Sequence, residues 1–317
     1  MTEPGTHSKT IAGIHHITGI CGPAQENLDF YTRFLGLRLV KKTVNFDDPG
    51  TYHLYYGDGG GSPGTILTFF PWEHSPAGRA GVGMVTHTAF SIPPAAIDYW
   101  VGRFADQGYD FVSPLERLGQ VVIGINAPDG LALELVGDPE VESLAGWADG
   151  PTEPAHAIRA FHSATLSVRD FDFLQGLFSE TFGYSLVVEG GDRIRLAAPG
   201  NEIGRHVDLV IDRERVLQRA GRGTIHHIAF RAADEASQME WRDKLLSAGL
   251  RVTEVLDRNY FKSIYFREPG GILFEIATDA PGFAVDEPED TLGSGLKLPP
   301  WLEPRRSEIE KRLVPLT

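Results

Sequence analysis

Four short stretches of apolar and β-branched residues recur along the chain, each with a histidine at the equivalent place. They are IHHITGIC around His16, VTHTAFSI around His87, FHSATLSV around His162 and IHHIAFRA around His227. Runs rich in isoleucine, valine, threonine and phenylalanine are typical of strands that are buried on one or both faces. The recurrence of one pattern predicts four copies of a single module.

A helix is predicted after each of these strands, because the apolar positions then follow a helical period. In the first copy Leu28, Tyr31 and Leu35 fall on one face, and Gly36 suits the helix end, where left-handed backbone costs glycine little. Comparable stretches that also end at a glycine span 93–108, 169–183 and 234–249. Short β-type runs follow each helix, and a turn such as SPG or PGG precedes the last run. The predicted unit is therefore β-α-β-β-β.

Composition and charge limit the classes of protein to consider. The 317 residues exceed the usual size of one domain, and 42% hydrophobic residues suffice for a large core. No apolar run reaches the roughly 18 residues of a membrane span, and the N-terminus has no export signal, so a cytoplasmic protein is expected. Cys21 is the single cysteine and cannot form an intramolecular disulfide. The net charge of −14 disfavours nucleic acid and favours small molecules as partners.

Carboxylates occur at matching places near the ends of the modules. Four residues after the turn glycine, the second module has Glu134 and the fourth has Glu275, whereas the first has Thr68 and the third offers Asp208. Two histidines and one carboxylate form a triad that leaves positions open on iron(II) for other molecules. Two sets of ligands are compatible with this pattern: His16, His227 and Glu275, or His87, Glu134, His162 and Asp208.

The first set is favoured because its two modules share the IHHI doublet, and because Thr68 leaves the first module without a carboxylate. Neighbouring residues of a strand point to opposite faces, so one histidine of each doublet faces a metal ion. His16 and His227 align with that position, and Thr18 shares the inward face with His16. The alternative is a site that has lost its metal and keeps structural histidines. The second set fits buried hydrogen-bonded pairs equally well.

Four such modules with these histidines resemble the vicinal oxygen chelate superfamily, which includes glyoxalases and extradiol dioxygenases. The resemblance implies an α+β fold, with four βαβββ modules paired into two cupped mixed β-sheet barrels around a metal. We accordingly expect an N-terminal domain over 1–140, a linker over 141–156 and a C-terminal domain over 157–280, with two modules in each domain. The tail over 281–317 contains Trp301 and spaced leucines, so it is expected to form a short helix that packs on the body.

Longer motifs are similar to those of ring-cleaving dioxygenases that act on hydroquinones. They are YHLYYGD, PGTILTFFPW, DRNYFKSIYFREPGGILFEIAT and TLGSGLKLPPWLEPRRSEIEKRLVPL. This resemblance implies metal ligands at His16, His227 and Glu275, and catalytic pocket residues at His15, Thr18, His226, Arg258 and Tyr265. It also implies an iron(II) cofactor, a small aromatic substrate and O2, although manganese(II) accepts the same ligands. His53, within YHLYYGD, is interpreted as structural.

Two other functions stay open at this point. A glyoxalase-like metal-dependent lyase or isomerase would share the fold, but its metal usually takes a carboxylate or amide from both modules, and Thr68 disfavours this. A metal-free small-molecule binding protein would also share the fold, and the intact triad disfavours it. The sequence leaves open the ring substituents of the substrate, the choice of iron or manganese, and the oligomeric state, a homo-oligomer included.

Overall fold

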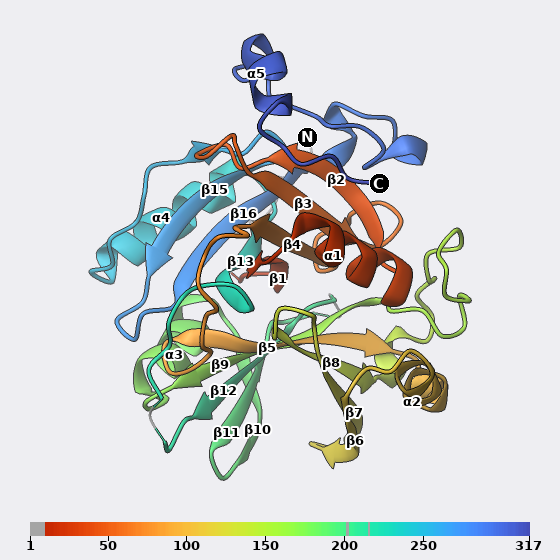
Figure 1. Cartoon of the computed structure of the whole chain (residues 1–317). Helices are drawn as coiled ribbons and strands as arrows, with labels where there is room; N and C mark the ends of the chain where they lie inside the picture. The colour runs from red at the N-terminus through yellow and green to blue at the C-terminus, as the bar shows by residue number, and fades with distance from the viewer. Residues whose placement is uncertain (1–9, 201–202, 215) are drawn as a thin grey trace, which may run out of the picture.

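Two curled, mixed β-sheets of eight strands each form the body of the molecule (Figure 1). The computed structural model describes residues 10–200, 203–214 and 216–317. Its strands follow the orders β14-β15-β16-β13-β1-β4-β3-β2 and β10-β11-β12-β9-β5-β8-β7-β6. The first sheet forms the upper layer in Figure 1, and the second forms the lower layer. The predicted α+β class with two cupped sheets is confirmed.

Each module has the predicted order of one strand, one helical segment and three strands. The first contains β1 (Ile14–Cys21), α1 (Ala24–Asp29), the π-helical turn η1 (Phe30–Phe34), β2 (Arg38–Val44), β3 (Tyr52–Gly57) and β4 (Ile66–Pro71). The second contains β5 (Met84–Ile92), the 3-10 turn η2 (Pro94–Ala96), α2 (Ile97–Asp106), β6 (Phe111–Arg117), β7 (Gln120–Asn126) and β8 (Ala132–Gly137), and the 3-10 turn η3 (Pro139–Val141) follows it.

The third and fourth modules repeat this order. The third contains β9 (Ala160–Val168), α3 (Asp172–Gly176), the π-helical turn η4 (Leu177–Thr181), β10 (Ser185–Gly190), β11 (Arg193–Ala197) and β12 (His206–Ile211). The fourth contains β13 (Thr224–Ala232), α4 (Glu235–Ser247), β14 (Leu256–Asp257), β15 (Phe261–Arg267) and β16 (Leu273–Pro281). In the described part of the chain, every helix is too short or too polar to cross a membrane.

Modules that are far apart in the sequence share a sheet. Within every module the first strand pairs in parallel with the last, as β1 does with β4 and β13 with β16. Antiparallel pairing of β1 with β13 joins the first module to the fourth, and that of β5 with β9 joins the second to the third. Each sheet therefore combines strands from both predicted domains, 1–140 and 157–280. The division of the chain into those domains stays a prediction.

The helical segments end where the sequence pattern placed their ends. Each is followed by a glycine with positive φ: Gly36 at 76°, Gly108 at 72°, Gly183 at 78° and Gly249 at 82°. Residues with a Cβ atom rarely adopt this conformation, which explains why each segment stops there. One continuous core contains apolar residues of both sheets and of all four helical segments, among them Tyr31, Trp100, Phe178 and Trp241. This core holds the two layers together.

The C-terminal tail packs on the outer edge of the first sheet. It contains η5 (Phe283–Val285), η6 (Glu289–Thr291), η7 (Glu303–Arg305) and α5 (Arg306–Glu310), drawn in dark blue at the top of Figure 1. Leu296 forms a parallel bridge with Lys42 of the edge strand β2, which leaves less of that edge open to another chain. Ile309 and Leu313 are buried in one cluster with Val44 of β2.

A buried lysine ties the tail to this sheet. Lys41 of β2 is 0% exposed, and its Nζ donates to Asp286 Oδ1 at 2.7 Å and to Glu287 Oε2 at 2.8 Å. Glu287 is 3% exposed and also accepts from the backbone N–H groups of Gly293 and Gly295. The lysine charge thus compensates a carboxylate that has little access to water.

Replacing Lys41 by alanine is expected to lower the free energy of unfolding by about 3–5 kcal/mol, because Glu287 would remain a buried carboxylate without its partner. Urea denaturation followed by circular dichroism measures the loss. Arg213→Ala is the matched control, since Arg213 pairs with Asp192 at the surface, where an ion pair contributes little. Equal losses in the two variants would show that Lys41 does not stabilise the fold in this way.

Candidate metal centre

The two IHHI doublets meet at the middle of the first sheet, where β1 and β13 pair. The register of this pairing shifts twice, which leaves His15 on β1 and His226 on β13 as one extra residue each, without a directly paired residue. Such β-bulges bend the strand and redirect the side chains on either side of them. They relax the strict alternation that the sequence pattern assumed for the doublets.

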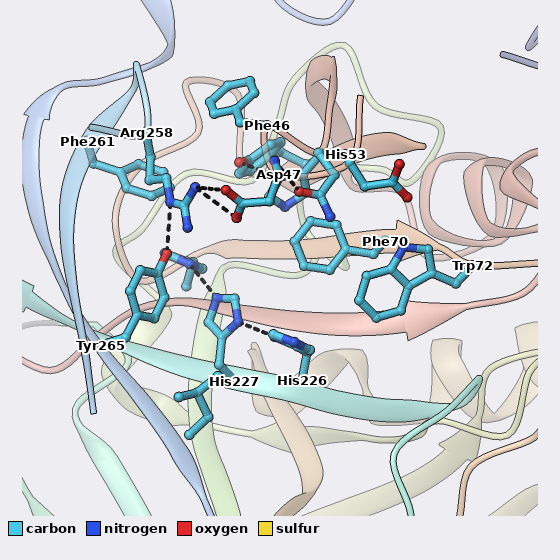
Figure 2. A pocket seen from close by; sticks show the side chains of 15 residues that line it. Phe46, Asp47, His53, Phe70, Trp72, His226, His227, Arg258, Phe261 and Tyr265 are labelled. Carbon is cyan, nitrogen blue, oxygen red and sulfur yellow. Dashed lines mark hydrogen bonds and ion pairs between the residues drawn. The ribbon is translucent and has the colours of Figure 1, made fainter. Parts of the chain in front are cut away.

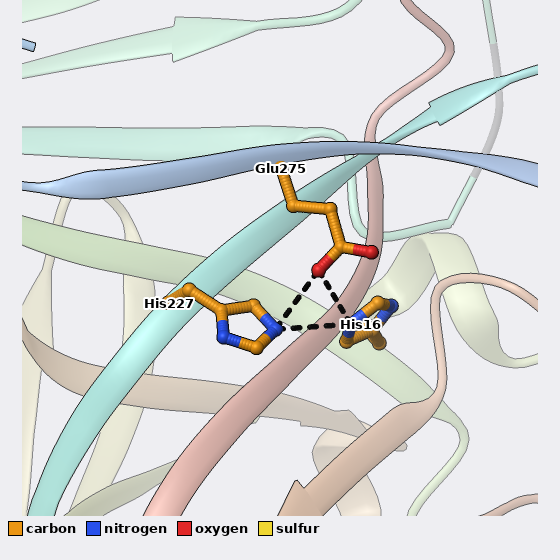
Figure 3. A group of neighbouring side chains, drawn as sticks. All are labelled: His16, His227 and Glu275. Carbon is orange, nitrogen blue, oxygen red and sulfur yellow. Dashed lines mark hydrogen bonds and ion pairs between the residues drawn. The ribbon is translucent and has the colours of Figure 1, made fainter. Parts of the chain in front are cut away.

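His16, His227 and Glu275 point toward one another from the adjacent strands β1, β13 and β16 (Figure 3). The Nε2 atom of His16 lies 3.3 Å from that of His227, and Glu275 Oε2 lies 3.3 Å from the first and 2.9 Å from the second. All three side chains are buried, and Glu275 is 0% exposed. Among the described residues, 10–200, 203–214 and 216–317, these three form the one group of histidine, cysteine or acidic side chains whose donor atoms lie close enough together to bind a metal ion.

The donor atoms of this group suit a cation. A hydrogen atom between two of them can satisfy only one pair, whereas a metal ion satisfies the lone pairs of all three at once. Burial alone would raise the pKa of Glu275, but the charges and hydrogen bonds of His16 and His227 hold it well below its usual range. Burial lowers the pKa of His227. An ionised carboxylate and a neutral imidazole are the protonation states in which these groups bind metals.

The neighbouring histidines orient the two rings. His15 Nδ1 lies 2.9 Å from His16 Nδ1, and His226 Nδ1 lies 2.8 Å from His227 Nδ1. Burial, followed by the charge of the adjacent histidine, lowers the pKa of His15 well below its usual value and that of His226 to about 3. A neutral His15 or His226 can accept a hydrogen bond from the Nδ1–H group of its neighbour. The Nε2 lone pairs of His16 and His227 then face the centre, as in metal sites that an outer hydrogen bond orients.

Two hydroxyl groups also contact the ligand set. Ser263 of β15 donates a hydrogen bond to Glu275 Oε1, which leaves Oε2 directed at the histidines. Thr18 Oγ1 lies 2.9 Å from His227 Nε2 and 3.0 Å from Thr68 Oγ1. The carboxylate is therefore held from one side and His227 from the other.

A cavity of about 400 Å³ opens beside the centre (Figure 2). Its apolar wall consists of aromatic and aliphatic side chains: Phe46, Tyr55, Phe70, Trp72, Phe261 and Leu273. His16 and His227 reach the cavity, whereas Glu275 lies behind them. Aromatic walls with a few polar groups are typical of sites for small, flat ligands.

Three of the five predicted pocket residues line this cavity: His226, Arg258 and Tyr265. Figure 2 shows Arg258 between Tyr265 and Asp47; its Nε donates to the Tyr265 hydroxyl at 3.3 Å, and its NH1 lies 3.1 Å from Asp47 Oδ2. Thr18 is 0% exposed and lies beneath the cavity. His15 lies outside the cavity lining, 2% exposed, with its ring against Phe261. Their catalytic roles stay predictions.

The sequence analysis missed several residues of the cavity. His53, interpreted as structural, lines it together with Tyr55, and Asn45, Asp47 and Asp48 lie at its rim. A period of two along β3 could have indicated the first pair, because positions 53 and 55 share a face of the strand. The rim residues belong to the loop between β2 and β3, whose course has no periodic signal.

The alignment of His162 with His16 and His227 was wrong. His162 is the extra residue of a bulge on β9, as His226 is on β13, so Ser163 takes the place that corresponds to His227. A one-residue bulge changes which residue faces the centre and leaves no mark on the spacing of the repeats.

The two carboxylates of the second set of candidate ligands bind arginines instead. Glu134 accepts from Arg117 at 2.7 and 2.6 Å, and Asp208 accepts from Arg193 at 2.6 Å and from Arg195 at 2.7 Å. His162 Nε2 lies 3.0 Å from Gln120 Oε1. The second sheet thus carries its own positive charges at the place equivalent to the metal centre.

Fold and site together define a glyoxalase-type protein with a buried group of two histidines and one carboxylate. The model of the Glyoxalase/Bleomycin resistance protein/Dioxygenase superfamily matches residues 13–135 and 136–276. The chain belongs to this superfamily.

Similar proteins extend over nearly the whole chain. It is 46% identical over 308 residues to the "Putative ring-cleaving dioxygenase MhqO" of Bacillus subtilis, with 97% of each chain covered. It is 32% identical over 308 residues to the chlorohydroquinone/hydroquinone 1,2-dioxygenase of Sphingobium indicum, with 94% of this chain and 95% of the other covered. A crystal structure of a "putative dioxygenase" from Bacillus subtilis matches with a TM-score of 0.93 at 46% identity, over 98% of this chain and 99% of that one.

Glu275→Gln is expected to weaken metal binding by more than the roughly 10–100-fold that loss of an outer hydrogen-bond partner costs, because it removes the charged ligand. Calorimetric titration with zinc(II) and metal analysis after dialysis measure the change. Glu134→Gln is the control, since Glu134 is a buried carboxylate of the second sheet and pairs with Arg117. If Glu275→Gln retains wild-type affinity, Glu275 is not a ligand.

Ser263→Ala is expected to lower metal affinity by roughly 10–100-fold, because Glu275 loses the hydroxyl that directs its carboxylate. The same titration measures it. Ser91→Ala removes a comparable buried hydrogen bond, from β5 of the second sheet to Asp138 directly after β8, and is expected to leave metal affinity unchanged. A loss of affinity of the same size in both variants would contradict a specific effect on Glu275.

Proposed function

We propose that the protein is an iron(II)-dependent, extradiol-type ring-cleaving dioxygenase whose substrates are hydroquinone-type diphenols. The convergence of His16, His227 and Glu275 beside an aromatic cavity is the observation that carries this proposal. The names of the similar proteins support it, because they describe ring cleavage and, in one case, hydroquinone as substrate. A cytoplasmic location stays a prediction from the sequence.

Iron(II) is the metal that the proposed reaction favours. A triad of two histidines and one carboxylate leaves open positions and is characteristic of non-haem iron(II) oxygenases. When bound, iron(II) supplies the redox chemistry through which the electrons of a diphenol ring reach dioxygen. Manganese(II) accepts the same three ligands, so the choice of iron rests on the reaction.

The cavity combines aromatic walls with several polar side chains. Phe70 and Trp72 stack on one wall, with ring centroids 5.4 Å apart, and Phe261 lies at the opposite side in Figure 2. An aromatic ring between such walls displaces water and gains offset or edge contacts. Its hydroxyl groups would then meet His226, Tyr265 and the centre itself.

Tyr265 would donate a hydrogen bond to the substrate. Burial, followed by the charge of Glu275, raises the pKa of Tyr265, so its hydroxyl keeps its proton. Arg258 donates to the oxygen of that hydroxyl at 3.3 Å, which fixes the position of the hydroxyl beside the cavity. Together they would orient one hydroxyl of the diphenol.

The reaction balances without a further cofactor. A diphenol and O2 combine, the ring bond beside a hydroxyl-bearing carbon breaks, and both atoms of O2 enter the product. That product is an open-chain acid that also carries an aldehyde or acyl group. The ring supplies the electrons, so neither a nicotinamide nor a flavin is needed.

Protein purified anaerobically with iron(II) is expected to consume O2 with hydroquinones and to form an open-chain product. Mass spectrometry with 18O2 should show two labelled oxygen atoms in that product. His227→Ala should lose at least about 10²-fold in rate, because the metal ligand is gone, and Glu134→Gln should retain the rate. An oxygen electrode measures both.

Other results of the metal-binding and O2-uptake measurements would favour one of the alternative functions. Tight metal binding without O2 uptake would favour a glyoxalase-like lyase or isomerase. A wild-type protein that binds no metal would favour a small-molecule binding protein of the same fold. Uptake with catechols alone would keep the dioxygenase and overturn the proposed substrate class.

A further inference from the structure

A chain of hydrogen bonds begins at Thr18, beside the candidate metal ligand His227, and ends at the wall of the cavity. Thr18 Oγ1 lies 2.9 Å from His227 Nε2 and 3.0 Å from Thr68 Oγ1. Thr68 Oγ1 lies 2.7 Å from His53 Nε2, and the Nδ1 atom of His53 lies 2.8 Å from the Tyr55 hydroxyl. Hydroxyls both donate and accept, and the two nitrogens of a neutral imidazole divide these roles. A proton can therefore pass along this chain in either direction.

The pairing of the strands places Thr68 at the centre. Thr18 pairs with Thr68 across β1 and β4 as Ala229 pairs with Glu275 across β13 and β16. Thr68 thus occupies, in the first module, the position that Glu275 occupies in the fourth. A threonine hydroxyl brings no charge, so a metal ion at the centre would have no protein carboxylate on this side.

Burial differs along this chain of hydrogen bonds in a way that suits transfer of a proton toward the cavity. Thr18 and Thr68 are both 0% exposed, so no water competes for their hydroxyls. His53 is partly exposed and lines the cavity, where its ring lies 4.3 Å from that of Phe70. The inner end of this hydrogen-bond chain is thus buried, and its outer end reaches the cavity.

We propose that Thr18 and Thr68 carry a hydroxyl proton of the bound diphenol to His53, which releases it to water in the cavity. This proposal rests on the proposed function for the identity of the diphenol. The O–H bond of the diphenol breaks as its proton moves to Thr18 Oγ1, the Thr18 proton moves to Thr68, and the Thr68 proton moves to His53 Nε2. The singly ionised diphenol and an imidazolium result, and no electrons are transferred.

The surroundings of His53 keep its ring neutral. The charged and titratable groups that face it come from its own strand β3, from β1, β13 and β16, and from the loop before β15: Tyr55, His16, His227, Glu275 and Arg258. Burial, followed by His16 and His227, lowers the pKa of His53 well below its usual value, while Glu275 opposes this effect. A neutral ring can accept a proton, and a low pKa makes it return that proton quickly.

Anaerobic stopped-flow spectroscopy tests the transfer without any cleavage step. Zinc(II)-loaded protein is mixed with nitrohydroquinone, whose absorption shifts when its hydroxyl ionises. We expect His53→Ala and Thr68→Val to slow this shift by about 10²-fold, a typical contribution of general acid–base transfer. Thr88→Val, which changes a buried threonine of the second sheet, should leave the rate unchanged. All variants should bind zinc as the wild type does.

Added imidazole separates a proton path from a structural role. It should restore the rate of His53→Ala, because a small base can enter the cavity beside the vacated position. It should not restore Thr68→Val, in which the path is interrupted between the centre and the base. Unchanged rates in both variants, the absence of imidazole rescue, or a wild-type protein that binds the dye without ionising it would each overturn the proposal. Because no O2 is present, failure of ring cleavage would leave this result standing.

Discussion

The antiparallel pairing of β1 with β13 is the interaction on which the rest of the structure depends. It joins His16 to His227, which lie 211 residues apart in the chain. Because each of these strands also pairs in parallel with the last strand of its own module, the same ladder places Thr68 and Glu275 on either side of the histidines. One set of backbone hydrogen bonds thus defines the ligand set, its open side and the base of the cavity.

The two sheets have the same strand arrangement but compensate the charge of their buried carboxylates in different ways. In the first sheet one carboxylate faces two imidazoles, so the centre lacks a permanent positive charge and suits a cation. In the second sheet two carboxylates meet three arginine side chains, which supply that charge from the protein. Buried carboxylates need one form of compensation or the other. The frame alone therefore does not determine whether a module pair binds a metal.

Much of this arrangement could be predicted from the sequence. The sequence repeats predicted the four modules. The ends of the helical segments were predicted from Gly36, Gly108, Gly183 and Gly249, because a helix end depends on local backbone chemistry. The combination of His16, His227 and Glu275 could be singled out because Thr68 breaks the pattern of its module. The bulges at His15 and His226 could not be predicted from the sequence, since strand register depends on pairing with distant residues. His53 was missed for a related reason: its importance arises from Thr68 on the neighbouring strand.

Because the first and last modules share one sheet, the metal centre can form only late in the synthesis of the chain. The partners of His16 on β13 and β16 are synthesised more than 200 residues after His16 itself. At roughly 5–20 residues per second, the first module waits on the order of ten seconds or longer with β1 unpaired on that side. Every strand of the second sheet, β5 to β12, is synthesised during that interval. A nascent chain that stops before β16 would thus contain all strands of the lower layer but would lack Glu275, the charged member of the metal centre.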